Sequence, residues 1–270
     1  MGWELQRSLA GLGDVIATNR REFDLCDSNA MRSIIRKTSP DIIVNAAAYT
    51  AVDNAESEPD VAMQVNAIAP GVLAAEAKLL GALLVHYSTD YVFDGSKKSP
   101  YKEEDAPNPL SVYGRSKLKG EQAIAASKCR HLIFRTSWVY GPRGRNFLLT
   151  ILKAAREKPR LQVVDDQFGA PTSSLAIAEA TARALQVRAA PSLYHMTAGG
   201  RTSWFGFAQA ILRNAAISTP VVPIRSDQYP AKATRPRNSV LDNSRLKETF
   251  GVSLADWESQ LEQVMAEVLQ

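Results

Sequence analysis

The chain has 270 residues, which is long for one small domain and short for two. Its 45% hydrophobic and 22% charged residues are near globular averages, and 15 Gly with 14 Pro exclude disordered, collagenous and coiled-coil classes. The net charge of +4 comes from 32 basic and 28 acidic residues interspersed along the chain, so no basic patch predicts binding to nucleic acid.

Apolar runs of three to six residues alternate with longer amphipathic stretches, which is the pattern of βα units around a buried parallel sheet. The strands are predicted at Val15–Ala17, Ile42–Val44, Leu83–Tyr87, Leu132–Phe134, Leu161–Val164 and Tyr194–Met196. The helices are predicted at Ser28–Thr38, Val61–Leu80, Ser111–Ser127, Phe147–Lys158, Ser174–Val187, Trp204–Ala215 and Leu254–Leu269. The fold class is therefore α/β, a doubly wound sheet of the Rossmann type.

The regular alternation gives way to proline-containing loops after about residue 145. We predict a dinucleotide-binding domain over residues 1–145. Residues 146–270 are predicted to form mainly a smaller lobe that shapes a substrate site, with some elements returning to the sheet. No apolar run is long enough to span a membrane and no apolar segment follows the N-terminus, so we expect a cytoplasmic protein.

A helix is expected before the first predicted strand, because Trp3, Leu5, Leu9 and Leu12 have helical spacing. A doubly wound sheet normally begins with a strand whose glycine-rich turn leads into such a helix and binds a pyrophosphate. Only Gly2 matches that turn, so the first strand and the glycine-rich turn are expected to be absent, with weaker folding and cofactor binding as the result. A domain that simply opens with a helix is the alternative.

Polar side chains lie at the end of the strand Leu83–Tyr87. Ser88, Thr89 and Asp90 follow it directly, at the carboxyl edge of the sheet where ligands bind in open α/β folds. A hydroxyl at Thr89 could hold a carbonyl oxygen there.

Tyr113 and Lys117 are four residues apart and share one face of the helix predicted at 111–127. An ammonium one turn from a phenol favours the phenolate and lowers its pKa toward the working pH of a general acid. Taken with the polar strand end upstream, this pair predicts an active site.

These motifs resemble the extended short-chain dehydrogenase/reductases, and more narrowly the dTDP-4-dehydrorhamnose reductases. The resemblance spans nearly the whole chain. It rests on four runs in order: Val44–Asp53, His86–Phe93, Phe134–Tyr140 and Asp166–Thr172.

The resemblance implies a role for specific residues. The catalytic residues would be Thr89, Tyr113 and Lys117. The cofactor would be bound by Gly2, Asn19, Arg20, Asp24, Leu25, Ala48, Tyr49, Thr50, Tyr87, Tyr113 and Lys117. The substrate would be contacted by Thr89, Asp90, Trp138 and Arg235, with Arg237 a further neighbour of its diphosphate. The alternative for Trp138 is a place in the core. The alternative for Arg235 and Arg237 is an interdomain salt bridge.

Asn19 and Arg20 stand where an NAD enzyme usually carries an acid for the ribose, which favours NADPH and leaves NADH open. Glu4 matches one ligand of a Mg²⁺ site at a subunit contact of some relatives. After Thr172, however, Ser173 and Ser174 stand without an acid, which argues against a metal there. The sequence leaves open whether the protein forms a homodimer.

The implied activity is reduction of the C4 ketone of a dTDP-4-dehydro-6-deoxy sugar to dTDP-L-rhamnose, a precursor of cell-surface polysaccharide. Two alternatives stay open. One is another nucleotide-sugar epimerase or dehydratase of the same group. The other is a non-catalytic regulatory subunit resembling the β subunit of methionine adenosyltransferase.

Overall fold

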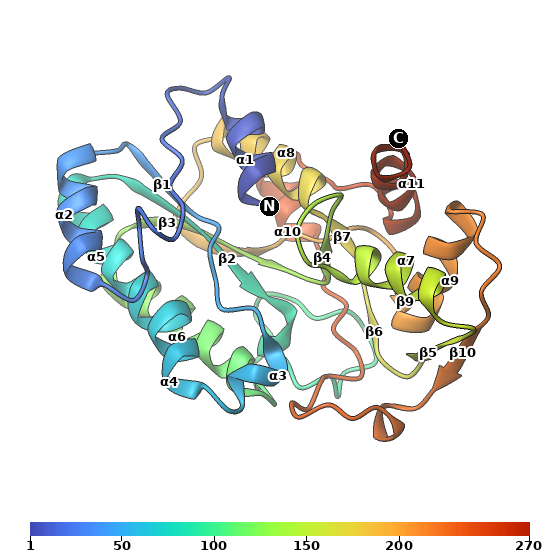
Figure 1. The fold of residues 1–270 in the computed structure, drawn as a ribbon. Coiled ribbons are helices and arrows are strands. Elements are labelled where there is room, and N and C mark those ends of the chain that lie inside the picture. The colour runs from blue at the N-terminus through green and yellow to red at the C-terminus, as the bar shows by residue number, and fades with distance from the viewer.

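The computed structural model describes every residue from Met1 to Gln270 and has a four-stranded parallel sheet at its centre (Figure 1). The strand order is β1-β2-β3-β8, with β1 at Ile42–Asn45, β2 at Leu83–Thr89, β3 at Arg130–Thr136 and β8 at Ser192–His195. The register pairs Val44 with Val85, and Thr89 at the end of β2 with Thr136 at the end of β3. The α/β class with a parallel sheet is confirmed.

Helices cover both faces of this sheet (Figure 1). The first face carries α2 (Ser28–Thr38), α5 (Ala69–Leu80) and α6 (Val112–Ser127). The opposite face carries α1 (Gly2–Leu9), α8 (Ser174–Leu185) and α10 (Ser244–Phe250). Successive strand residues point to opposite faces, so Leu84 and Ile133 pack toward the first set while Val85 and Leu132 pack toward the second.

Side-chain caps fix where the helices begin. Asp27 Oδ1 accepts hydrogen bonds from the backbone N–H groups of Asn29 and Ala30 at the start of α2. Ser111 Oγ accepts from the Gly114 N–H at the start of α6, which sets the rotation of the helix that carries Tyr113.

A second cluster of apolar side chains lies beyond the main sheet, within elements that are drawn to the right in Figure 1. It is built by α7 (Phe147–Glu157), α9 (Trp204–Asn214) and α11 (Trp257–Val268), and by the parallel pair β5 (Leu161–Val164) and β10 (Val221–Ile224). The remaining short strands form two pairs: β4 (Val139–Tyr140) pairs with β7 (Thr172–Ser173), and β6 (Phe168–Gly169) pairs with β9 (Thr202–Ser203). The division near residue 145 stays a prediction.

The predicted strand Val15–Ala17 is wrong. These residues are exposed and irregular, because no neighbouring strand offers them hydrogen bonds. A cavity of about 930 Å³ separates them from β1, whose other edge pairs with β2.

The predicted helix Val61–Leu80 is interrupted. It consists of α4 (Pro59–Met63), a π-helical turn η1 (Gln64–Ile68) and α5. The remaining short helices are α3 (Val52–Ala55), η2 (Asp90–Val92) and η3 (Ser226–Gln228). None of the helices has both the length and the apolar character needed to cross a membrane.

Candidate active site

Thr89 and Asp90 lie at the carboxyl end of β2, where both side chains are buried. Thr89 Oγ1 donates a hydrogen bond to Asp90 Oδ1 over 3.0 Å and accepts one from the Tyr91 N–H over 3.1 Å. Burial raises the pKa of Asp90 to about 7. Its Oδ2 has no hydrogen-bond partner in the protein, so this strand end presents an unsatisfied polar atom that suits a polar ligand.

Tyr113 projects from the first turn of α6 toward this strand end. Its ring packs edge-on against Tyr91 with centroids 5.9 Å apart. Burial raises the pKa of Tyr113 to about 12, and a hydrogen bond with Thr89 opposes that rise. Gly114 permits the close approach of α6, because a Cβ there would collide with the Tyr91 carbonyl oxygen.

Lys117 lies one turn further along α6 and is 2% exposed. Its Nζ donates to the Tyr87 carbonyl oxygen over 2.6 Å and lies 3.2 Å from His86 Nε2. Burial lowers the pKa of Lys117 to about 8. The Lys117 amine thus contacts β2. The sequence had led us to expect that it lowers the pKa of Tyr113, but burial raises that pKa and Lys117 is not among the groups that shift it.

Seven of the eleven predicted cofactor residues surround one cavity of about 930 Å³, bounded by α1, residues 12–25 and the end of β1. They are Gly2, Asn19, Arg20, Asp24, Leu25, Ala48 and Tyr49. The four residues outside the lining of this cofactor cavity are Thr50, Tyr87, Tyr113 and Lys117.

Asn66 fixes the loop that carries Ala48 and Tyr49. Its Oδ1 accepts from the Tyr49 N–H over 2.9 Å, and its Nδ2 donates to the Tyr49 carbonyl over 3.0 Å and to Ser116 Oγ on α6 over 3.0 Å. This residue lies in the π-helical turn η1, and π turns recur at functional sites. Sequence reasoning missed it, because an asparagine inside an apolar helical pattern gives no signal of a π turn.

The turn after residue 18 presents Arg20 to the cofactor cavity, and Asp24 lines the same cavity. Asn19 is held within the turn, since its Nδ2 donates to Glu22 over 2.7 Å and its Oδ1 accepts from the Arg21 N–H. Arg20 is exposed and forms no ion pair. Its charge is therefore free for a phosphate.

Trp138 is held face to face with Trp204, with ring centroids 3.5 Å apart and planes 6° from parallel. Its backbone has a left-handed φ of 48°, which is rare for a bulky residue and costs about 1–3 kcal/mol. A Cβ on Gly169 would lie 2.5 Å from the indole, so Gly169 leaves room for the ring. Trp138 remains partly exposed, consistent with both a packing role and a ligand contact.

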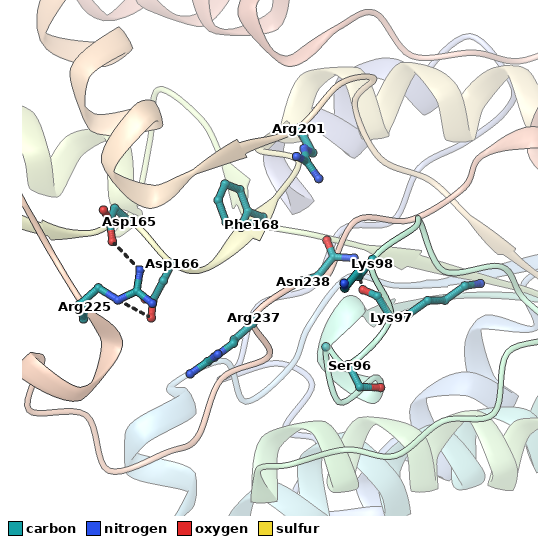
Figure 2. A pocket seen from close by; sticks show the side chains of 11 residues that line it. Ser96, Lys97, Lys98, Asp165, Asp166, Phe168, Arg201, Arg225, Arg237 and Asn238 are labelled. Atoms are coloured by element: carbon teal, nitrogen blue, oxygen red, sulfur yellow. Dashed lines mark hydrogen bonds and ion pairs between the residues drawn. The ribbon is translucent and has the colours of Figure 1, made fainter.

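A second cavity, of about 540 Å³, is lined by cations around Phe168 (Figure 2). We call it the basic cavity. Arg225 pairs with Asp165 and Asp166 on its wall. The cations that line it without a carboxylate partner are Lys98, Arg201 and Arg237.

Arg235 lies two residues from this cavity but is engaged elsewhere. Its guanidinium forms a bidentate ion pair with Asp53 of α3, with distances of 2.6 and 3.2 Å. This contact fits the salt-bridge alternative. Glu4 is buried, and its carboxylate lies 3.8 Å from Arg143.

Comparison with known proteins shows the family of the chain. The family model for the RmlD substrate binding domain matches residues 1–270. The chain belongs to the RmlD family. A dTDP-4-dehydrorhamnose reductase of Burkholderia thailandensis is 50% identical over 274 residues, which cover 95% of this chain and 92% of that protein.

Solved structures of the same enzyme resemble this RmlD family chain closely. A dTDP-4-dehydrorhamnose reductase from Clostridium acetobutylicum superposes with a TM-score of 0.96 at 37% identity, covering 100% of this chain and 96% of that one. The enzyme from Bacillus anthracis, solved in complex with NADP, superposes with a TM-score of 0.95 at 33% identity, covering 98% and 95%.

Proposed function

We propose that this protein reduces the C4 ketone of dTDP-4-dehydro-β-L-rhamnose to dTDP-L-rhamnose with NADPH. The observation that carries the proposal is the joint placement of Thr89, Asp90, Tyr113 and Lys117 at the carboxyl end of β2. Relatives that bear the name of this reductase support it over nearly the whole chain.

The nicotinamide, when bound, supplies the hydride for the ketone carbon. Tyr113 donates its phenolic proton to the developing alkoxide, which is what a neutral phenol with a pKa of about 12 can do throughout the physiological range. Thr89 aligns the carbonyl oxygen, and Lys117 supplies a buried positive charge beside the reacting atoms.

The cofactor cavity fits a dinucleotide phosphate. Arg20 lines the cavity without an ion-pair partner, so its charge is available for a 2′-phosphate, and Asn19 stands where an NAD enzyme usually carries an acid for the ribose. The N-terminus of α1 borders the cavity at Gly2 and offers unpaired N–H groups to a pyrophosphate. We therefore favour NADPH over NADH.

The basic cavity is the proposed place of the diphosphate of the nucleotide sugar. Lys98, Arg201 and Arg237 offer charge that no carboxylate neutralises, and Phe168, at 36% exposure, offers a ring for stacking. Arg235 contributes indirectly, because its ion pair with Asp53 holds its segment against α3. Trp138 lies beside the sugar. A cytoplasmic location, where nucleotide sugars and NADPH are found, and a homodimer stay predictions.

Incubation of the purified protein with NADPH and dTDP-4-dehydrorhamnose tests the proposal. We expect oxidation of NADPH that depends on the sugar nucleotide, the appearance of dTDP-L-rhamnose, and a lower KM for NADPH than for NADH. Binding of NADPH without any oxidation would instead indicate a regulatory subunit, and products epimerised or dehydrated without net oxidation of NADPH would contradict reduction.

A further inference from the structure

Lys117 is held at its far end by an imidazole that the proposed reaction does not use. His86 lies on β2 and is 1% exposed, and its Nε2 lies 3.2 Å from Lys117 Nζ. On the other side of the ring, Nδ1 lies 3.1 Å from Nδ2 of Asn45 on β1. The three side chains form a buried row across two neighbouring strands and α6.

No carboxylate holds the Lys117 amine directly. Glu121, one turn along the same helix, is the acid that acts on it, but Glu121 forms a bidentate pair with Arg135 of β3 over 2.9 and 2.7 Å. The Tyr87 carbonyl and the His86 ring are therefore the contacts that fix Nζ.

His86 can accept a hydrogen bond without adding a second charge. Burial, and then the nearby Lys117 ammonium, hold the pKa of His86 well below its usual range, so the ring is neutral. A neutral imidazole carries one N–H and one lone pair, so the partner on one nitrogen determines what the other nitrogen can do.

Asn45 supplies the matching partner. With its Nδ2 donating to Nδ1, the imidazole proton lies on Nε2 and faces an unprotonated Lys117 amine. A half-turn of the amide gives up the 3.3 Å hydrogen bond that Asn45 Oδ1 accepts from the Ala47 N–H and brings that oxygen to Nδ1. The imidazole proton then moves to Nδ1, and Nε2 accepts from a Lys117 ammonium. The two amide orientations therefore correspond to the two protonation states of Lys117.

We propose that His86, with Asn45, is a positioning residue that holds Lys117 Nζ beside the active site in both protonation states of the amine. This role rests on the proposed reductase function. Loss of the imidazole destabilises the ammonium form of Lys117 more than its amine form, because hydrogen bonds to charged groups are the stronger ones.

The test compares the pH profile of kcat/KM for the parental protein with those of His86→Leu and His86→Gln. Leucine removes the acceptor from a buried strand position, whereas the glutamine amide can still accept from Lys117. We expect the alkaline limb of the leucine variant to move down by about one pH unit, the value of one hydrogen bond to a charged group, with kcat reduced about tenfold or more. The glutamine variant should keep the parental limb. A folded leucine variant with an unshifted limb would overturn the proposal.

A second measurement does not need activity or a stable variant of His86. In protein labelled with ¹⁵N-histidine, the imidazole shifts of His86 should report a change of tautomer as Lys117 titrates, and Lys117→Met should abolish that change. A His86 tautomer that is constant across the titration of Lys117 would refute the coupling. Absence of NADPH oxidation by the parental protein would refute the reductase function and leave this test intact.

Discussion

Thr89 donates its hydroxyl proton to Oδ1 of Asp90 across 3.0 Å. A hydroxyl has one proton, so Thr89 cannot donate to a substrate carbonyl while this bond is made. A protonated Asp90 can donate to Thr89 instead and free the hydroxyl proton for the ketone oxygen. The protonation state of Asp90 thus decides whether Thr89 is ready to bind substrate.

The pKa of Asp90, raised to about 7, places this change within the working range. We predict that kcat/KM of the parental protein falls in two steps as pH rises: a fall through about 8, set by Lys117, and, before it, a fall through about 7, set by Asp90. Asp90→Asn, whose amide donates to Thr89 at every pH, should flatten that fall. Steady-state kinetics at pH values on both sides of 7 check this, and an equally steep fall in the Asn variant would exclude Asp90 as its origin.

Asp90 also predicts a pH dependence of stability. Because its pKa is higher in the folded than in the unfolded state, the folded protein binds the proton more tightly, and stability falls as pH rises from about 4 to about 7. A rise of this pKa to about 7 corresponds to at most about 4 kcal/mol of stability. Chemical denaturation at pH 5 and pH 8 should show a smaller loss in Asp90→Asn than in the parental protein. A loss of the same size in both would show that Asp90 is not the group responsible.

Gly114→Ala tests the contact between α6 and Tyr91. The added Cβ would collide with the Tyr91 carbonyl oxygen, so α6 and Tyr113 must shift. We expect about 1–3 kcal/mol of destabilisation from overpacking and a loss of about 100-fold in kcat from misplacement of the acid. Gly11→Ala, where no atom lies within 4 Å of the new Cβ, is the matched control. Parental kcat in Gly114→Ala would mean that this approach does not set the position of Tyr113.

Arg237→Gln tests the basic cavity as the diphosphate site. Loss of one charge-assisted hydrogen bond should raise KM for the sugar nucleotide about tenfold, with kcat and KM for NADPH little changed. Arg213→Gln, an exposed position on α9, is the control. An unchanged KM for the sugar nucleotide in Arg237→Gln would place the diphosphate elsewhere.

Much of the fold follows from the sequence. Ser28–Thr38 matches α2 because Asp27 caps a helix with clear periodicity, and Leu83–Tyr87 lies within β2 because a buried parallel strand is apolar on both faces. Val15–Ala17 fails for a non-local reason: an apolar run becomes a strand only beside another strand, and a single segment does not reveal its neighbours.

The residues of the candidate site likewise divide into those that the sequence could predict and those that it could not. Tyr113 and Lys117 could be found from spacing along one helix. Asn66 and His86 could not, because their roles depend on contacts 17 and 31 residues away in the chain. The pairing of Arg235 with Asp53 joins positions 182 residues apart, so sequence left it as one of two alternatives.

The most direct measurement compares the parental protein with Tyr113→Phe in the reduction of dTDP-4-dehydrorhamnose by NADPH. The ring keeps its packing against Tyr91, so thermal unfolding should be nearly the same, while the proton donor is lost. We expect sugar-dependent oxidation of NADPH by the parental protein and a loss of most of that turnover in Tyr113→Phe. Turnover at the parental rate in the Phe variant would contradict the role of Tyr113 as the proton donor.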